Sequence, residues 1–212
     1  MAEGLTLRNI EITKGDRRLI RVDRHVAPGE VLTIMGPSGV GKSTLLAFLT
    51  GSLAPVFTAT GQIVLDGTDV TDAPAETRRI GILFQDDLLF PHLSVGQNLA
   101  FGLTAGGSRS ERRDRIDAAL SEIGLEGFAD RDPATLSGGQ KARVALMRML
   151  LSDPRALLLD EAFSGLDAAL REQMRTLVFT RAETNRLPVV MVTHDAEDAE
   201  AADGTVIRLG QD

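Results

Sequence analysis

Residues 36–44 read Gly36-Pro37-Ser38-Gly39-Val40-Gly41-Lys42-Ser43-Thr44 and match the phosphate-binding-loop pattern G-x-x-x-x-G-K-[ST]. An apolar run precedes them and a segment that can be helical, 42–50, follows, which is the strand–loop–helix context of such loops. Glycines let backbone N–H groups surround phosphate oxygens, and the helix amino terminus adds partial positive charge. We therefore expect all nine residues to bind a phosphate chain, with Lys42 at the β- and γ-phosphates and Ser43 on Mg²⁺. The alternative is a glycine turn that only caps a helix.

Two acidic residues follow a second apolar run. Residues 156–159 are Ala-Leu-Leu-Leu and lead directly into Asp160 and Glu161. A buried strand that ends in an acid places that acid beside the phosphate-binding loop, so we expect Asp160 to organise Mg²⁺ through its water shell. Glu161 can then polarise the water that attacks the terminal phosphate. The alternative is a strand end that carries two solvated acids.

A third motif, Leu136-Ser137-Gly138-Gly139-Gln140, opens a segment with helical spacing. We expect Ser137 to cap this helix and the two glycines to leave backbone N–H groups free for an anion. One chain then has two phosphate-binding surfaces, about 95 residues apart in sequence. Because a helical insertion should hold them apart, we expect a head-to-tail homodimer that buries two nucleotides, each between the loop of one chain and this motif of the other.

The pattern of apolar residues along the chain predicts an α/β fold. The runs 31–35, 156–159 and 188–192 are typical of parallel strands buried on both faces, and a helix is expected at about 168–183. From about residue 94 to 150 the spacing becomes helical, which predicts a helical insertion. Further short strands are expected at 5–12, 19–26, 62–65 and 80–84.

Composition excludes several classes of protein. The chain has 212 residues, a formal net charge of −7 and no Cys, which argues against a disulfide framework, a zinc ribbon and a general attraction for nucleic acid. No apolar run approaches the roughly 18 residues of a membrane span, and the first residues lack the pattern of a secretion signal. We expect a cytoplasmic protein that reaches a membrane only through a partner.

On these motifs the chain resembles the ATPases of ATP-binding cassette (ABC) transporters, from about Leu5 to Leu209. The resemblance implies a P-loop NTPase core with an N-terminal antiparallel β subdomain and an inserted α-helical subdomain, all within one domain of residues 1–212. It implies that residues 1–85 and 151–212 form the core with its β subdomain. Residues 86–150 would form the helical subdomain with the signature motif at 136–140.

The resemblance also assigns roles to single residues, with ATP and Mg²⁺ as cofactors. Gln85 matches the glutamine that contacts Mg²⁺ and the attacking water, and His194 matches the switch histidine at the γ-phosphate. Ser164-Gly165-Leu166-Asp167 matches a loop that crosses the dimer interface. The catalytic residues are thus Glu161, His194 and Gln85. Taken alone, a histidine after a strand is more often structural.

The segment 84–95, with its Leu, Phe and Pro residues, is similar to ATPases of binding-protein-dependent importers for iron, polyamines, sulfate or thiamine, and in particular to the YnjD-like short ATPases. The resemblance implies integral membrane permease subunits that dock on this segment at the inner face of the cell membrane, and a periplasmic or lipid-anchored binding protein. No further regulatory domain is expected after Leu209. The other interpretation of segment 84–95 is that it only packs the insertion.

Two alternatives to transport remain at this point. A soluble ABC ATPase that acts on nucleic acid or ribosomes would have the same motifs, but usually adds a coiled coil, a second cassette or a basic extension. A P-loop kinase would lack residues 136–140.

The chain departs from the family pattern at the base-binding position, where Lys14 replaces an aromatic residue and the chain has no Tyr or Trp. Either Lys14 or an arginine among Arg17, Arg18 and Arg21 lies over the base, or these residues are solvated. Ala162 also replaces a frequent Pro.

Overall fold

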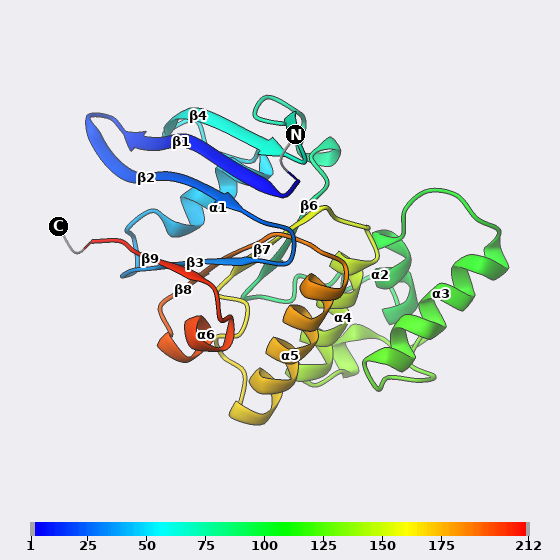
Figure 1. Ribbon diagram of the computed structural model, residues 1–212. Helices are drawn as coiled ribbons and strands as arrows, with labels where there is room; N and C mark the ends of the chain where they lie inside the picture. Colours follow the sequence, from blue (N-terminus) through cyan, green and yellow to red (C-terminus); the bar gives the residue numbers. More distant parts are fainter. Residues whose placement is uncertain (1–2, 211–212) are drawn as a thin grey trace.

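The computed structural model describes residues 3–210, and its strands form two sheets (Figure 1). The first sheet is antiparallel, with the order β2-β1-β4-β5. β1 pairs with β2 on one side and with β4 on the other, so it is an inner strand of this sheet. The strands are β1 (Leu5–Lys14), β2 (Arg17–Val26), β4 (Thr58–Leu65) and β5 (Thr68–Asp69).

The second sheet is parallel, with the order β6-β7-β8-β3-β9. Every residue of β3 and β8 is buried, as strands covered on both faces require. In such a sheet, loops after the carboxyl ends of neighbouring strands meet at one edge, and these loops carry the predicted site. The strands are β3 (Val31–Met35), β6 (Ile80–Phe84), β7 (Ala156–Asp160), β8 (Val189–Thr193) and β9 (Thr205–Arg208).

Alternate residues of the parallel strands face two different hydrophobic clusters. Leu158 and Val190 belong to a first cluster, which also contains residues of the antiparallel sheet and of helix α1 (Lys42–Thr50). Leu157 and Leu159 face the opposite way, into a second cluster with helices α4 (Gly138–Leu150) and α5 (Ala168–Thr184). This period of two is the expected pattern for strands that separate two layers.

Helices α2 (Val95–Gly102), α3 (Arg109–Glu122) and α4 lie to one side of the parallel sheet (Figure 1). Each begins with a capping box, in which a serine hydroxyl accepts from the third helical N–H and a Gln or Glu side chain returns the bond. α4 is shared between clusters. Ala145 and Leu146 pack in the second cluster, whereas Val144 and Met147 pack in a third cluster with α2 and α3.

The fold class predicted from the sequence is confirmed, with differences in the extent of elements. β4 begins at Thr58 rather than at residue 62, because Thr58 still pairs with Thr13 of β1. The helical stretch 94–150 is broken twice, at 103–108 and at 123–137, and the second break contains only a 3₁₀ turn. The edge strand β9 and helix α6 (Ala196–Ala201) were not predicted, since both are short and mostly polar or exposed. Within residues 3–210, every helix is too short or too polar to cross a bilayer.

Candidate functional site

The loop between β3 and α1 holds its lysine inward. Lys42 is 5% exposed, and its Nζ donates hydrogen bonds to the carbonyl oxygens of Gly36 at 2.7 Å and Pro37 at 3.2 Å. The same Nζ lies 3.7 Å from Oε1 of Glu161. Gly41, which precedes α1, has a φ of 110° and lies against Leu19 of β2, so a side chain at this position would be strained and crowded. The loop thus folds around the ammonium group of Lys42, with two of its own carbonyl oxygens as acceptors.

The end of β7 approaches this loop through Asp160. The Ser43 hydroxyl donates to Oδ1 of Asp160 at 3.0 Å, across 117 residues of sequence. Burial raises the pKa of the Asp160 carboxyl, the hydrogen bond from Ser43 opposes this shift, and the nearby Glu161 adds to it. Gln85 follows Phe84, which pairs with Asp160 in the sheet, so Gln85 begins the adjacent loop at the same edge.

These oxygens suit Mg²⁺ better than a metal that needs a complete protein cage. Within residues 3–210, no group of three or more His, Cys, Asp or Glu side chains is arranged to hold an ion. Mg²⁺ usually takes one or two protein oxygens and completes its shell with water and substrate phosphates. The paired oxygens of Ser43 and Asp160 match that requirement.

Glu161 and His194 face each other across the ends of β7 and β8. Nδ1 of His194 lies 3.2 Å from Oε2 of Glu161, and the two side chains are 60% and 24% exposed. Glu161 has a φ of 49°, which is uncommon for a residue other than glycine. Its N–H donates to the carbonyl of Val192 at 3.0 Å, and its carbonyl accepts from the hydroxyl of Ser164 at 2.7 Å. A strained backbone fixed on both sides therefore presents a carboxylate beside the phosphate-binding loop.

The motif 136–140 forms the start of α4, as predicted. The Ser137 hydroxyl accepts from the N–H of Gln140 at 3.3 Å, so Ser137 caps the helix. A Cβ on Gly139 would lie 2.3 Å from a terminal methyl group of Leu170 of α5, so a larger residue here would require the Leu170 side chain to move. Asp167 caps α5 through the N–H of Leu170 at 3.0 Å. Residues 137–139 and 165–167 accordingly line one hollow, together with Arg143 and Leu170.

That hollow is separate from the one at the phosphate-binding loop, which is lined by Gly36, Pro37 and His194 with residues 208–210 at the end of β9. None of the hydrogen bonds found within residues 3–210 joins Ser137, Gly138, Gly139 or Gln140 to residues 36–44. The structure therefore brings Lys42, Ser43, Asp160, Glu161 and His194 together, with Gln85 in the neighbouring loop. It places the signature motif with Asp167 instead.

An aromatic ring that sequence reasoning missed lies beside Lys14. The Nζ of Lys14 is 5.9 Å from the centre of the Phe57 ring, which comes from the residue before β4. Thr13 pairs with Thr58, so the register of the sheet brings Phe57 next to Lys14. Phe57 stands 43 residues away from Lys14 in sequence, and only the pairing of β1 with β4 could have revealed the contact.

The segment 84–95 combines exposed apolar side chains with a rigid support. Phe84, Leu88 and Phe101 are 42%, 57% and 69% exposed, and together they line a groove beside α4. Fully buried Asn98 fixes the backbone beneath: its Oδ1 accepts from the Phe90 N–H at 2.8 Å, and its Nδ2 donates to the Phe90 carbonyl. The segment therefore presents an exposed apolar surface beside α4.

Known proteins are similar to this chain over most of its length. The family described as ABC transporter matches residues 19–164. The uncharacterized ABC transporter ATP-binding protein YnjD of Escherichia coli K12 is 48% identical over 98% of this chain and 95% of its own length. The thiamine import ATP-binding protein ThiQ of Jannaschia is 45% identical over 97% of this chain and 88% of its own length.

Solved structures of ATP-binding cassette proteins have the same fold as this chain. The dimeric post-hydrolysis state of the ATP-binding cassette MJ0796 bound to ADP and Pi has a TM-score of 0.79 and 33% identity, covering 97% of this chain and 94% of its own. The protein cbiO1 of Clostridium perfringens, part of the transporter complex cbiONQ, has a TM-score of 0.81 and 29% identity, covering 98% and 85%. A family match over most of the chain, relatives of nearly equal length and a shared fold establish that this chain belongs to the ABC transporter family, among its ATP-binding, ATP-hydrolysing subunits.

Proposed function

We propose that this chain hydrolyses Mg²⁺-ATP as one half of a homodimer and thereby drives a solute importer through a separate membrane permease. The observation that carries the proposal is the cluster at the ends of β3, β7 and β8: Ser43 bonded to Asp160, and His194 facing Glu161. In this arrangement the loop itself supplies a cation and a hydroxyl group, and the adjacent strand ends supply two carboxylates and an imidazole. Residues 36–44 would bind the phosphates.

Each side chain then has one task. Lys42 exchanges its two carbonyl acceptors for β- and γ-phosphate oxygens. Ser43, Asp160 and Gln85 would hold Mg²⁺ directly or through water, and the ion would neutralise charge that develops on the transferred phosphoryl group. Glu161 orients and polarises the attacking water, and His194 contacts the γ-phosphate from the opposite side. Glu161 lies close to Lys42 before ATP arrives, so this contact has to give way to phosphate.

The second half of each site comes from the partner chain. The helix amino terminus at residues 137–140 lies in a hollow that, among the described residues, is not lined by the phosphate-binding loop 36–44 of the same chain. Asp167 lies in the same hollow and would cross the interface with it. In the proposed dimer, each ATP lies between residues 36–44 of one chain and residues 137–140 of the other.

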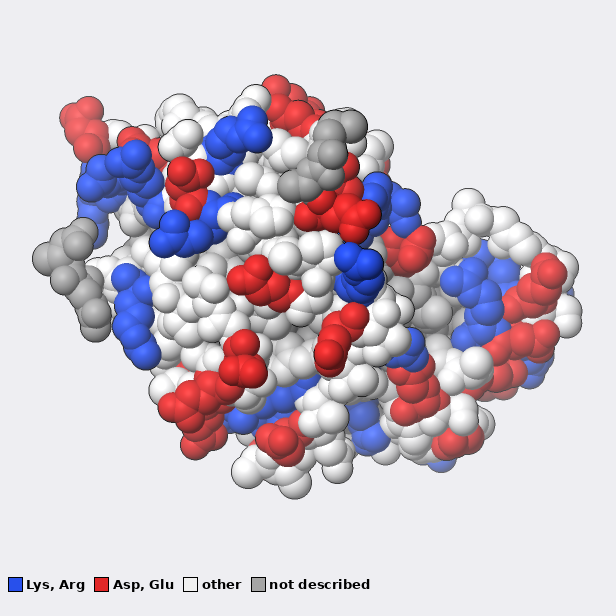
Figure 2. All heavy atoms as spheres, viewed as in Figure 1, with Lys and Arg blue, Asp and Glu red and all other residues white. Residues whose placement is uncertain are grey.

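Segment 84–95 is the proposed docking surface for the permease. Residues 86–150 form the proposed helical subdomain, which would transmit movements of the permease to the signature motif at 136–140. Two relatives are named as import proteins, for thiamine and for Fe(3+) ions, which supports the direction of transport. A periplasmic or lipid-anchored binding protein is the further partner that we propose for an importer. The chain would then lie at the inner face of the cell membrane. Acidic and basic side chains are interspersed over the face in Figure 2, with no continuous basic surface of the kind that nucleic acid requires.

The direct test is light scattering on Glu161→Gln, with ATP and without Mg²⁺. We expect this variant to bind ATP, to lose nearly all hydrolysis and to form a dimer with ATP but not with ADP. A variant that hydrolyses ATP like the parent would remove Glu161 from its role. If no dimer forms although a titration shows ATP binding, the two-chain site has to be abandoned for the isolated subunit.

Mixing two inactive variants tests the shared site independently. Lys42→Ala damages the phosphate-binding loop, and Ser137→Arg obstructs the signature surface. Their mixed dimer has one site with both defects and one with neither, so an equimolar mixture should regain about a quarter of the parent activity if pairing is random and the sites are independent. A site contained within one chain would regain none.

A further inference from the structure

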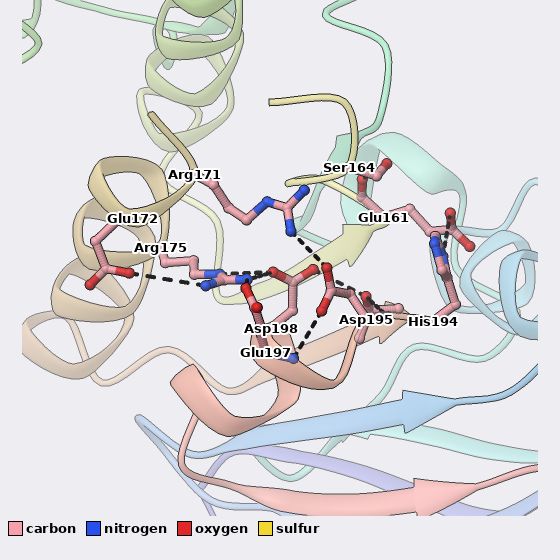
Figure 3. A network of polar contacts seen from close by, with 10 residues as sticks. Glu161, Ser164, Arg171, Glu172, Arg175, His194, Asp195, Glu197 and Asp198 are labelled. Carbon is pink, nitrogen blue, oxygen red and sulfur yellow. Dashed lines mark hydrogen bonds and ion pairs between the residues drawn. The ribbon is translucent and has the colours of Figure 1, made fainter. Parts of the chain in front are cut away.

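A network of ion pairs and hydrogen bonds joins helix α5 to the loop that carries His194 (Figure 3). NH1 of Arg171 donates to Oδ2 of Asp195 at 2.7 Å, and Nε of Arg175 donates to Oδ1 of Asp198 at 2.7 Å. The two arginines are four residues apart, so they lie on the same face of α5, one turn after the other. Both acids belong to α6 or to its cap.

The network fixes the backbone on both sides of His194. The Thr193 hydroxyl donates to Oδ2 of Asp198 at 3.1 Å and accepts from the N–H of Asp195 at 3.0 Å. Thr193 and Asp198 are each 2% exposed, whereas the side chain of His194 is 60% exposed. The residue before His194 and the residue after it are thus held, while its imidazole stays free to meet Glu161 or a phosphate.

The other end of the network reaches the loop 164–167. α5 begins directly after Asp167, and Arg171 lies one turn into the helix. The same loop contacts Glu161, since the Ser164 hydroxyl donates to the Glu161 carbonyl. We infer that Arg171 and Arg175 are positioning residues, which tie the geometry of the dimer-interface loop 164–167 to that of His194. The inference rests on the proposed function of His194 and Asp167.

The contact of Arg171 is the one closest in sequence to His194. Its NH1 donates directly to Asp195, the residue that follows His194, whereas Arg175 bonds to Asp198 further along α6.

The test compares Arg171→Ala with Arg181→Ala. Both replace an arginine of α5 that forms an ion pair, but Arg181 pairs with Glu122 of α3, and lies roughly 15 Å further along the helix from Arg171. We expect Arg171→Ala to lower kcat about tenfold and to change the Kd for ATP less than about twofold, because Arg171 orients a group that acts after binding. Arg181→Ala should leave kcat and Kd within about twofold of the parent.

Asp195→Ser provides the matched change on the other partner. Serine can still cap α6, as Asp195 does through the Glu197 N–H, but it cannot form the ion pair. Asp195→Ser should reproduce the loss in kcat. The double variant Arg171→Ala, Asp195→Ser should lose no more than the more severe single variant, as expected for two members of one interaction. Additive losses would contradict the coupling.

The histidine signals in an NMR spectrum give a readout independent of turnover. The chain has only three histidines, His25, His92 and His194, so the imidazole signals can be assigned by single substitutions. In the nucleotide-free protein, Arg171→Ala should shift or broaden the His194 signal and leave those of His25 and His92 unchanged.

An unchanged His194 signal, or a kcat equal to that of Arg181→Ala, would overturn the inference. Failure of the proposed function would look different: the parent itself would not hydrolyse ATP, or Glu161→Gln would do so at the parent rate. The NMR comparison decides on the positioning role in that case too.

Discussion

Breaking the buried ion pair between Arg175 and Asp198 should destabilise the chain far more than breaking an exposed pair on the same helix. The side chains of Arg175 and Asp198 are only 8% and 3% exposed. Arg175→Met keeps the apolar stem but leaves the carboxylate of Asp198 buried, with Thr193 as its remaining hydrogen-bond donor. Loss of one partner from a buried pair typically costs about 3–5 kcal/mol of unfolding free energy. For a chain of this size, that lowers Tm by roughly 6–20 °C.

The double variant Arg175→Met, Asp198→Leu separates the cost of an isolated charge from the value of the pair. It removes both charges and retains apolar volume, so its unfolding free energy should return to within about 1–2 kcal/mol of the parent value. Arg181→Met is the matched control, because Arg181 and Glu122 are 36% and 29% exposed and their pair should contribute only about 0.2–1 kcal/mol.

Urea unfolding of the nucleotide-free protein, followed by circular dichroism, measures all three differences. The reasoning would be refuted if Arg175→Met were no less stable than Arg181→Met. It would also fail if the double variant were less stable than Arg175→Met, since the two losses would then add instead of cancelling.

Two further predictions concern the nucleotide site. Burial raises the pKa of Asp160, so the ionised carboxylate destabilises the chain at pH values above that pKa, and Asp160→Asn should raise the Tm of the nucleotide-free chain at pH 7. This gain should disappear as the pH falls below the raised pKa toward the usual value of about 4, because the carboxyl group of the parent is then protonated and uncharged. A gain that is independent of pH would contradict the assignment to burial. If Lys14 and Phe57 take the place of the aromatic residue that the family usually places against the base, the contact reads few atoms of the base. ATP and GTP should then bind with Kd values within about tenfold of each other by calorimetry. A much larger preference for ATP would show that the base is recognised elsewhere.

The sequence was sufficient for the fold class and for the residues that meet around the phosphate-binding loop, because both depend on local patterns. Residues 31–35, 156–159 and 188–192 are apolar runs of the kind that strands buried on both faces require. Asp160 ends one of these strands, and His194 directly follows another. The carboxyl ends of neighbouring parallel strands share an edge, so the distance between Ser43 and Asp160 in sequence did not matter.

Contacts that depend on strand register or on the packing of exposed elements were not predictable in the same way. Phe57 lies beside Lys14 only because β4 extends to Thr58 and pairs with the end of β1. Arg171 and Asp195 look like ordinary surface charges of two polar helices in the sequence, and their ion pair appears only when α6 packs against α5. The edge strand β9 is short and largely exposed, so it has no hydrophobic pattern from which to infer a strand.

The packing of α4 limits how the helical region can move. One side of this helix is embedded between the parallel sheet and α5, through Ala142, Ala145, Leu146 and Met149, while the other side belongs to the cluster with α2 and α3. Because close-packed side chains interlock, α4 cannot pivot freely about a loop without opening a cavity on one of its sides. A displacement of residues 95–150 relative to the sheet would therefore be a shear of small amplitude, in which side chains slide between neighbouring rotamers, rather than a wide hinge rotation.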